Sequence, residues 1–424
     1  MWQFPWQYKE SIAIVLGILM VGILLQLTLG SFNFYLLHYP VNIIIGLVII
    51  IATAFLSFKN NSLINWLSGV PLTVTLIGGL FLLTILMGLI PQFAKVNTDL
   101  HIHWDHSSWQ EILDYIFMKL GFKQMTTSWA FVLIYSFSLF VLGLVIAKRL
   151  HRFKWKDFAF YLNHLGLWLF LFAAGFGSAD MSRYVMYVEE GETEWRVYDD
   201  QENVKELDIA IQLHDFVMEE YPPKLAVVNK YTGDVQPESK PAYYQIDEKS
   251  KTDVLDVWQL ELEEYIHEAV RKTDTTFQAI PMAGSMPAAK VKMTNKETGI
   301  VVSGWLTCGS IDQFVMPLEL DSTYSLVMTK PEPKRFASDV TVMTEFEDMP
   351  IKTTLEVNHP LTIGSWMIYQ YDYDHALGKA SRMSGFELVY DPWLYPVYIG
   401  IFMVTIGAIC MLWLGKKNKQ KEKI

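Results

Sequence analysis

The sequence has little cysteine and lacks several common catalytic motifs. It contains 2 cysteines in 424 residues, too few for a disulfide-stapled scaffold or for a zinc or iron–sulfur site built from thiolates. Neither Cys308 nor Cys410 belongs to a Cys-x-x-Cys pair, which argues against thiol–disulfide exchange. There is no Walker A loop, no Gly-x-Ser-x-Gly elbow and no His-Glu-x-x-His pattern. These absences argue against a nucleotide-driven pump and a self-sufficient hydrolase.

Charge is also scarce, and it is unevenly distributed. Charged residues make up 19% of the chain, whereas soluble domains average about 25%. Residues 181–390 hold 36 acidic and 19 basic side chains, and the rest of the chain holds 9 acidic and 15 basic ones. The chain therefore joins an acidic, polar block to a charge-poor one. With a formal net charge of -11, we expect no nucleic-acid partner.

Long stretches without Asp, Glu, Lys or Arg predict membrane spans. Crossing the hydrocarbon takes about 20 apolar residues, and the charge-free windows are long enough for six crossings. The expected spans are 11–30, 40–58, 70–92, 126–147, 158–178 and 393–414. The first span has no cleavage pattern and further spans follow it, so we do not expect a removable signal peptide.

Basic residues predict the orientation of these spans. They concentrate in segment 148–156 and in the C-terminal tail, and such clusters beside membrane ends face the cytoplasm. Both termini are then cytoplasmic. The expected domains are two helices in 1–60, three helices in 61–180 with an outer loop at 93–125, an extracytoplasmic domain at 181–390, and the last helix with a basic cytoplasmic tail in 391–424.

The acidic block has the pattern of a β-rich domain. Apolar and polar residues alternate with the period of two that is typical of strands. The expected strands are 184–188, 207–213, 340–342, 353–357 and 366–371. Apolar residues at helical spacing between 254 and 269 predict one short helix. The fold class is thus an integral membrane α-helical bundle of about six spans, with a large β-rich extracytoplasmic domain between the last two spans.

His164 is the strongest candidate functional residue. It lies in the otherwise uncharged span 158–178, about 9 Å from its cytoplasmic end at 1.5 Å per residue. Ionisable residues inside a bilayer are costly and usually face a partner or a cavity. A neutral imidazole can ligate haem iron. The alternative is a structural histidine that is hydrogen-bonded to a neighbouring helix.

A second group of histidines lies in the outer loop. The spacing of His101, His103 and His106 could serve zinc or copper, and Trp109 could stack on a porphyrin together with His103 or His106 as ligands. The spacing matches no closed structural site well. A polar loop that has accumulated histidines without binding anything is therefore the favoured interpretation.

Three blocks of sequence resemble the ResB (CcsB) family of system II cytochrome c biogenesis. They are Gly-Leu-Ile-Pro-Gln at 88–92, Asn-His-Leu-Gly at 163–166 running on to 175–180, and Gly-Ser-Trp-Met-Ile-Tyr-Gln at 364–370 followed by Asp-Pro-Trp at 391–393. The resemblance covers the chain from about residue 70 onward. The family core is described with four spans, so the first two spans here look like an N-terminal addition. The tryptophan-rich haem-handling motif of the family's partner, CcsA (ResC), is absent.

The resemblance implies an accessory subunit of the cytochrome c haem lyase in a bacterial cytoplasmic membrane. Haem b would be taken from the cytoplasmic side, passed across with transient binding, and attached to the CxxCH thiols of an apocytochrome c outside. A CcsA/ResC-type membrane protein and the apocytochrome would be partners, together with thiol-reducing proteins. His164 is similar in position to the family's intramembrane haem-ligating histidine.

Two other classes of protein stay open on the sequence. One is a membrane redox protein of cytochrome b type, which holds haem permanently between paired histidines. The other is a non-catalytic, membrane-anchored sensor or scaffold, in which the acidic domain binds a ligand and His164 is inert.

Overall fold

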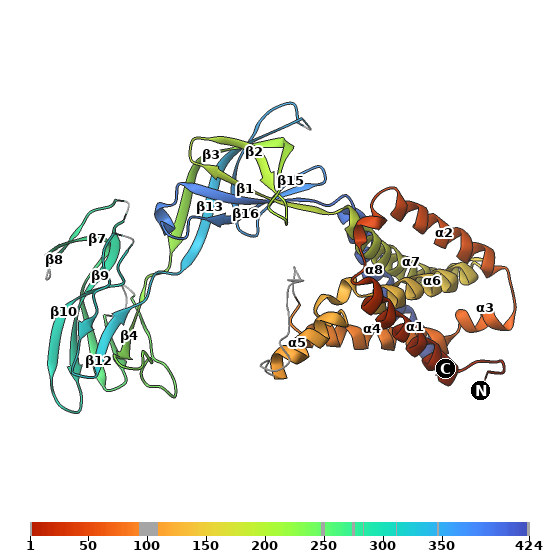
Figure 1. Cartoon of the computed structure of the whole chain (residues 1–424), viewed down its shortest axis with the longest axis horizontal. Helices are drawn as coiled ribbons and strands as arrows, with labels where there is room; N and C mark the ends of the chain where they lie inside the picture. Colours follow the sequence, from red (N-terminus) through yellow and green to blue (C-terminus); the bar gives the residue numbers. More distant parts are fainter. Residues whose placement is uncertain are drawn as a thin grey trace. The chain divides into compact units, whose positions relative to one another are not determined.

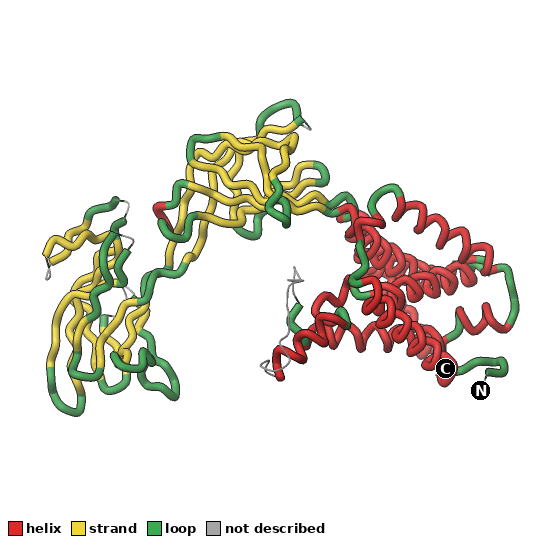
Figure 2. The backbone as a smooth tube through the Cα atoms, in the orientation of Figure 1, coloured by secondary structure: helices red, strands yellow, loops and turns green. Residues whose placement is uncertain are grey.

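The computed structural model describes residues 2–92, 109–246, 251–273, 276–282, 284–310, 312–345 and 347–421, the last eight of them as backbone only. The chain divides into two compact units. The helical unit comprises Met1–Ser182 and Asp391–Ile424, and the β unit comprises Arg183–Tyr390. Figure 2 colours helices red and strands yellow, so that the helical unit and the β unit can be told apart.

The described part of the helical unit is a bundle of apolar helices joined by short 3-10 turns. The α-helices are α1 (Tyr8–Leu29), α2 (Val41–Ser57), α3 (Ser62–Leu67), α4 (Val70–Leu89), α5 (Trp109–Lys119), α6 (Trp129–Leu150), α7 (Phe158–Phe176) and α8 (Leu394–Lys421). The 3-10 turns are η1 (Phe34–Leu37), η2 (Phe122–Thr127), η3 (Trp155–Asp157) and η4 (Gly177–Asp180).

Within the described residues, five helical segments are long and apolar enough to cross a membrane. They are Tyr8–Leu29, Val70–Leu89, Trp109–Leu150, Trp155–Asp180 and Leu394–Trp413. The remaining expected span, 40–58, corresponds to α2, which is apolar but has only 17 residues. At 1.5 Å per residue its length is about 26 Å, slightly short of a hydrocarbon core about 30 Å thick. Six crossings and their orientation stay a prediction.

Helix α6 is the centre of the bundle and packs against α1, α2, α4 and α7. Its first turn is capped by Ser128, whose hydroxyl accepts a hydrogen bond from the backbone N–H of Phe131. Fully buried aliphatic residues such as Leu72 and Ile134 fill the space between α4 and α6. Elsewhere the helices expose large apolar side chains, among them Ile51 and Phe81. Exposed apolar surface of this extent is typical of helices that face lipid or a partner.

The β unit contains three sheets. The eight-stranded sheet has the order β14-β13-β3-β2-β1-β17-β16-β15. Its strands are β1 (Ser182–Glu189), β2 (Thr193–Tyr198), β3 (Val204–Glu220), β13 (Pro333–Thr344), β14 (Ile351–Glu356), β15 (Leu361–Ile363), β16 (Trp366–Tyr373) and β17 (Met383–Tyr390). All five predicted strands lie in this sheet, in β1, β3, β13, β14 and β16, and are confirmed. The long strands β3 and β13 pair antiparallel.

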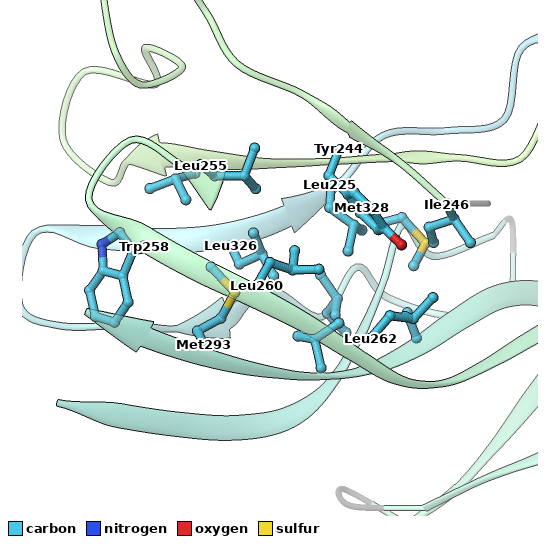
Figure 3. Packing of buried hydrophobic residues seen from close by; sticks show 14 of the residues in the cluster. Leu225, Tyr244, Ile246, Leu255, Trp258, Leu260, Leu262, Met293, Leu326 and Met328 are labelled. Carbon is cyan, nitrogen blue, oxygen red and sulfur yellow. The ribbon is translucent and has the colours of Figure 1, made fainter. Parts of the chain in front are cut away.

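The other two sheets share a second core. One has the order β10-β9-β7-β6 with β8 paired to β7, and the other has the order β11-β12-β4-β5. Their strands are β4 (Lys224–Asn229), β5 (Tyr244–Gln245), β6 (Thr252–Leu255), β7 (Trp258–Thr273), β8 (Thr276–Ala279), β9 (Met286–Asn295), β10 (Val301–Thr307), β11 (Leu318–Glu319) and β12 (Tyr324–Met328). Figure 3 shows Trp258, Leu260 and Met293 converging with residues from β4 and β12.

The helix predicted between 254 and 269 is wrong, because this segment forms β6 and β7. The error has a simple cause. Trp258 and Leu262 are four residues apart, and four is also an even number, so both lie on one face of β7. Leu260, which the helical pattern omitted, is fully buried between Trp258 and Leu262. The intervening Gln259 and Glu261 are exposed, which is the alternation of a strand.

Candidate functional site

His164 lies on α7 and has one ring nitrogen engaged by its own helix. Its Nδ1 is 3.1 Å from the carbonyl oxygen of Phe160, one turn earlier. A carbonyl oxygen only accepts hydrogen bonds, so Nδ1 carries the proton and Nε2 carries the lone pair. Within the part of the chain that the structure describes, Nε2 has no hydrogen-bond partner. The observed bond is thus within α7 and not to a neighbouring helix.

The imidazole of His164 is held in place by a ring and a nearby cation. The Phe160 ring stacks on it with centroids 3.8 Å apart. The guanidinium of Arg149 lies 4.1 Å from the centroid of the same Phe160 ring, and it also pairs with Asp157 at 3.2 Å. The half-buried imidazole therefore has a fixed tautomer, a restricted ring orientation and a positive charge close by.

Small residues bring α7 and α8 unusually close together beside this histidine. A Cβ atom added to Gly166 would lie 2.5 Å from Met403 Cβ, and one added to Gly407 would lie 2.5 Å from the backbone nitrogen of Asn163. Asn163 also donates a hydrogen bond from Nδ2 to the carbonyl oxygen of Val404 at 3.0 Å. Glycine contacts and interhelical hydrogen bonds are the usual means of helix association in membranes. Figure 1 draws α7 and α8 as neighbours in the bundle.

The donor set at His164 fits haem iron. An imidazole whose Nδ1–H is held by a backbone carbonyl presents Nε2 to a metal, which is the common arrangement of histidine ligands. His164 is the single histidine in the described apolar helices α1, α2, α4, α6, α7 and α8. This part of the chain therefore offers one axial ligand at that depth. A second axial ligand, where the iron has one, must come from elsewhere.

A buried carboxylate lies just beyond the other end of α7. Asp180 in η4 is 6% exposed, and its Oδ1 lies 2.9 Å from Nδ1 of His38. The same carboxylate accepts hydrogen bonds from the side chains of Asn42 and Trp393, each at 2.7 Å. Sequence analysis placed Asp180 and Trp393 in separate motifs and could not pair residues 138 or more positions apart. They join the ends of α2, α7 and α8.

The candidates in the outer loop stay predictions. His101, His103 and His106 lie outside the described residues. Trp109 is described, begins α5 and is 82% exposed. The described residues contain no group of three or more His, Cys, Asp or Glu side chains that could hold a metal ion.

An apolar cavity of about 370 Å³ lies between α2, α6 and α7. Trp168 and His151 line it, whereas His164 does not. The indole N–H of Trp168 is buried without a hydrogen-bond partner in the described structure. The cavity and the candidate ligand His164 are thus on different faces of α7.

Gln92 and Gln370, from the other two sequence blocks that resemble the ResB family, make hydrogen bonds within the fold. The amide of Gln92 donates to the carbonyl of Phe122 at 2.9 Å and accepts from the backbone N–H of Met125 at 3.0 Å. Gln370 is buried and accepts from the hydroxyl of Ser338 at 2.6 Å. These glutamines fix local turns and strands and have no contact with His164.

Comparison with known proteins supports the resemblance. A family model described as the ResB-like family matches residues 310–381. This segment lies in the β unit, includes β11 to β16 and contains the block 364–370. No curated protein matches the chain. The chain therefore combines a bundle of membrane-type helices with a β unit that carries a ResB-like segment.

Proposed function

We propose that this chain is a subunit of the system II cytochrome c synthetase, which helps to deliver haem across the membrane and to attach it to CxxCH apocytochromes together with a CcsA/ResC partner. The ResB-like match indicates a role in cytochrome c biogenesis, and the apolar helices fit a membrane protein. The observation that carries the finer proposal is the 3.1 Å contact between His164 Nδ1 and the Phe160 carbonyl oxygen, which favours a proton on Nδ1 and leaves Nε2 for iron.

In this proposal haem is the substrate, and the residues around His164 bind and orient it. His164 supplies one axial ligand through Nε2. The Phe160 carbonyl keeps the proton on Nδ1, and the Phe160 ring limits rotation of the imidazole. Arg149 places a positive charge beside that ring, suited to neutralise one propionate of the haem. Holding haem in fixed geometry favours its reaction with two thiols, because it removes much of the entropic cost of bringing them together.

The proposal also assigns the surroundings of the chain. The membrane is a bacterial cytoplasmic membrane, both termini are cytoplasmic, and the β unit lies outside. The 36 acidic and 19 basic residues in 181–390 would suit a basic apocytochrome surface, since complementary charge speeds association and selects partners. Thiol-reducing proteins would keep the CxxCH cysteines reduced.

The test is maturation of a reporter cytochrome in cells that lack a native system. The chain is co-expressed with a CcsA partner and a c-type reporter, and covalent haem on the reporter is scored after denaturation. Wild type should mature the reporter, and His164→Ala should abolish maturation at unchanged membrane levels. His151→Ala is the matched control, since His151 is the C-cap of α6 and packs edge to face with Phe58, and it should retain activity.

Exogenous imidazole separates a ligand role from a structural one. His164→Gly leaves space at the ligand position, and imidazole added to the cells should restore part of the covalent haem. If His164→Ala matures the reporter as well as wild type, His164 is no ligand. If wild type gives no covalent haem with a competent partner, the synthetase proposal is wrong.

A further inference from the structure

The apolar cavity between α2, α6 and α7 has a buried, unpaired donor in its wall. Trp168 lines the cavity and is 9% exposed. Its indole N–H has no hydrogen-bond partner among the residues that the structure describes. A buried donor without a partner is costly, because it has lost its bond to water and gained none in return. An acceptor that enters the cavity and reaches this N–H would remove the cost.

The indole of Trp168 is held in one orientation beside small residues of the cavity wall. Its ring stacks on Phe172, with centroids 5.2 Å apart and an interplanar angle of 2°. A Cβ added to Gly143 of α6 would lie 3.2 Å from Trp168 Nε1 and 3.3 Å from Thr53 Cγ2. The Thr53 hydroxyl already donates to the carbonyl oxygen of Ile49 at 2.8 Å. The donor available to a ligand at this point of the wall is therefore the N–H of Trp168.

The rest of the cavity is largely apolar, and its rim lies on the outer surface of the bundle. Ile146 and Thr53 are buried in its wall, whereas the rim residues Ile50, Leu150 and Leu165 are between 43% and 49% exposed. The volume of about 370 Å³ falls within the range of about 300–1,000 Å³ that is typical of small-molecule sites. An apolar rim on helices of this kind faces lipid, so a ligand dissolved in the bilayer can enter from the side.

The position of Trp168 along α7 restricts the kind of acceptor. Phe158 lies ten residues before it and Phe176 eight residues after it, which is about 15 Å and about 12 Å at 1.5 Å per residue. In a span across a hydrocarbon core about 30 Å thick, the indole is therefore near the middle. The ester carbonyls of glycerolipids lie in the polar regions outside that core and do not reach it. The acceptor must be carried into the hydrocarbon by an apolar molecule.

We propose that this cavity binds a lipid-soluble quinone, whose ring lies among the apolar residues and whose carbonyl oxygen accepts a hydrogen bond from Nε1 of Trp168. A quinone combines an apolar ring, a carbonyl acceptor and an isoprenoid tail that can pass the exposed rim into lipid. The inference goes beyond the proposed function and uses no property of haem, since His164 does not line the cavity.

The test is equilibrium dialysis of labelled menadione against the full-length chain in lipid nanodiscs, with empty nanodiscs as the blank. Wild type should bind one equivalent above the blank. Trp168→Phe keeps an aromatic ring but loses the N–H, and it should weaken binding by about 2- to 10-fold, the value of one hydrogen bond. Trp129→Phe is the matched control, because the indole N–H of Trp129 is also buried and unpaired in the described structure but lines no part of this cavity.

A ligand without carbonyls separates the hydrogen bond from apolar packing. Methylnaphthalene has the fused ring of menadione and no carbonyl, so it should bind wild type more weakly than menadione and should not distinguish Trp168→Phe from wild type. If menadione binds Trp168→Phe as tightly as wild type, or if methylnaphthalene binds wild type as tightly as menadione, the inference is wrong.

Filling the cavity tests where the quinone binds. Ala54 lines the cavity and is exposed, so Ala54→Phe adds a ring there without displacing a buried neighbour and should abolish menadione binding. Ile51→Phe is the control, since Ile51 is on the same helix, is exposed and does not line the cavity. Menadione binding that survives Ala54→Phe would place the quinone elsewhere and overturn the inference. Recovery of a phospholipid instead of a quinone, in an amount that depends on Trp168, would overturn it as well.

Discussion

The contact between α7 and α8 beside His164 gives the most quantitative prediction. Gly166→Ala adds a Cβ that would lie 2.5 Å from Met403 Cβ, 2.8 Å from the Val404 backbone nitrogen and 2.9 Å from the Gly400 carbonyl oxygen. Ordinary contacts at a Cβ are 3.4–4 Å, so the helices must separate by about 1 Å. Two of the three opposing atoms are backbone, and no side-chain rotation can relieve them.

The expected cost follows from two effects. Overpacking a well-fitted contact costs about 1–3 kcal/mol. Separation of the helices also lengthens the hydrogen bond from Asn163 to the Val404 carbonyl, now 3.0 Å, and a hydrogen bond contributes about 0.5–1.5 kcal/mol. The sum is about 2–4 kcal/mol, or about 30- to 700-fold in the unfolding equilibrium. Gly78→Ala on α4 is the matched control, because nothing lies within 4 Å of its added Cβ.

Unfolding in SDS–detergent mixtures, followed by helical circular dichroism, measures the effect on the helical unit. Gly166→Ala should lower the midpoint, whereas Gly78→Ala should change the unfolding free energy by less than about 1 kcal/mol and in the favourable direction. Met403→Gly should partly relieve Gly166→Ala, and Met403→Ala, which keeps the clashing Cβ, should not. Equal midpoints for the two glycine variants would refute the close packing of α7 on α8.

Three further measurements concern single groups. Asp180→Ala leaves buried donors unpaired and should destabilise the helical unit by about 3–5 kcal/mol in the same SDS titration, and a loss below about 1 kcal/mol would contradict the carboxylate network. Hydrogen bonds from Arg196 hold the pKa of Glu194 at about 2, against an ordinary 4.5. The resulting stability is present above about pH 4.5 and is lost as the pH falls towards 2. Arg196→Ala should therefore flatten the pH dependence of the urea midpoint of the β unit over that window, and an unchanged slope would remove the ion pair as its cause. Burial raises the pKa of Cys308 from 9.0 to about 11, which lowers the fraction of thiolate about 100-fold. In a Cys410→Ala background, maleimide should therefore label Cys308 slowly at pH 8 until the chain is denatured. Fast labelling of the native chain would show an accessible thiol.

The sequence predicts local structure well where the spacing of its apolar residues fits only a helix or only a strand. Charge-free windows become apolar helices, since a helix satisfies its backbone hydrogen bonds within one segment. Alternating segments such as 207–213 become strands of the eight-stranded sheet. Segment 254–269 fails because spacing of four residues fits both a helix and a strand, and only pairing with β9 decides between them. Such pairing involves residues distant in sequence and leaves no local signal.

The candidate site likewise has a part that one stretch of sequence reveals and a part that depends on residues distant in the chain. His164 could be singled out from one span, because an imidazole there is costly whatever surrounds it. Its tautomer required coordinates, since the bond to the Phe160 carbonyl competes with any bond to another helix. The pairing of His38 with Asp180 was out of reach, because it depends on how the ends of α2 and α7 meet.

The number of histidines also bears on how the chain works. A haem held permanently between helices in the manner of a cytochrome b takes two histidines facing each other. The described apolar helices contain His164 alone, and the carboxylate-held His38 lies about 18 Å or more further along α7. The two histidines are therefore too far apart to ligate one iron. Under the proposed function, His164 supplies one axial ligand and a second protein supplies the other, an arrangement suited to transfer.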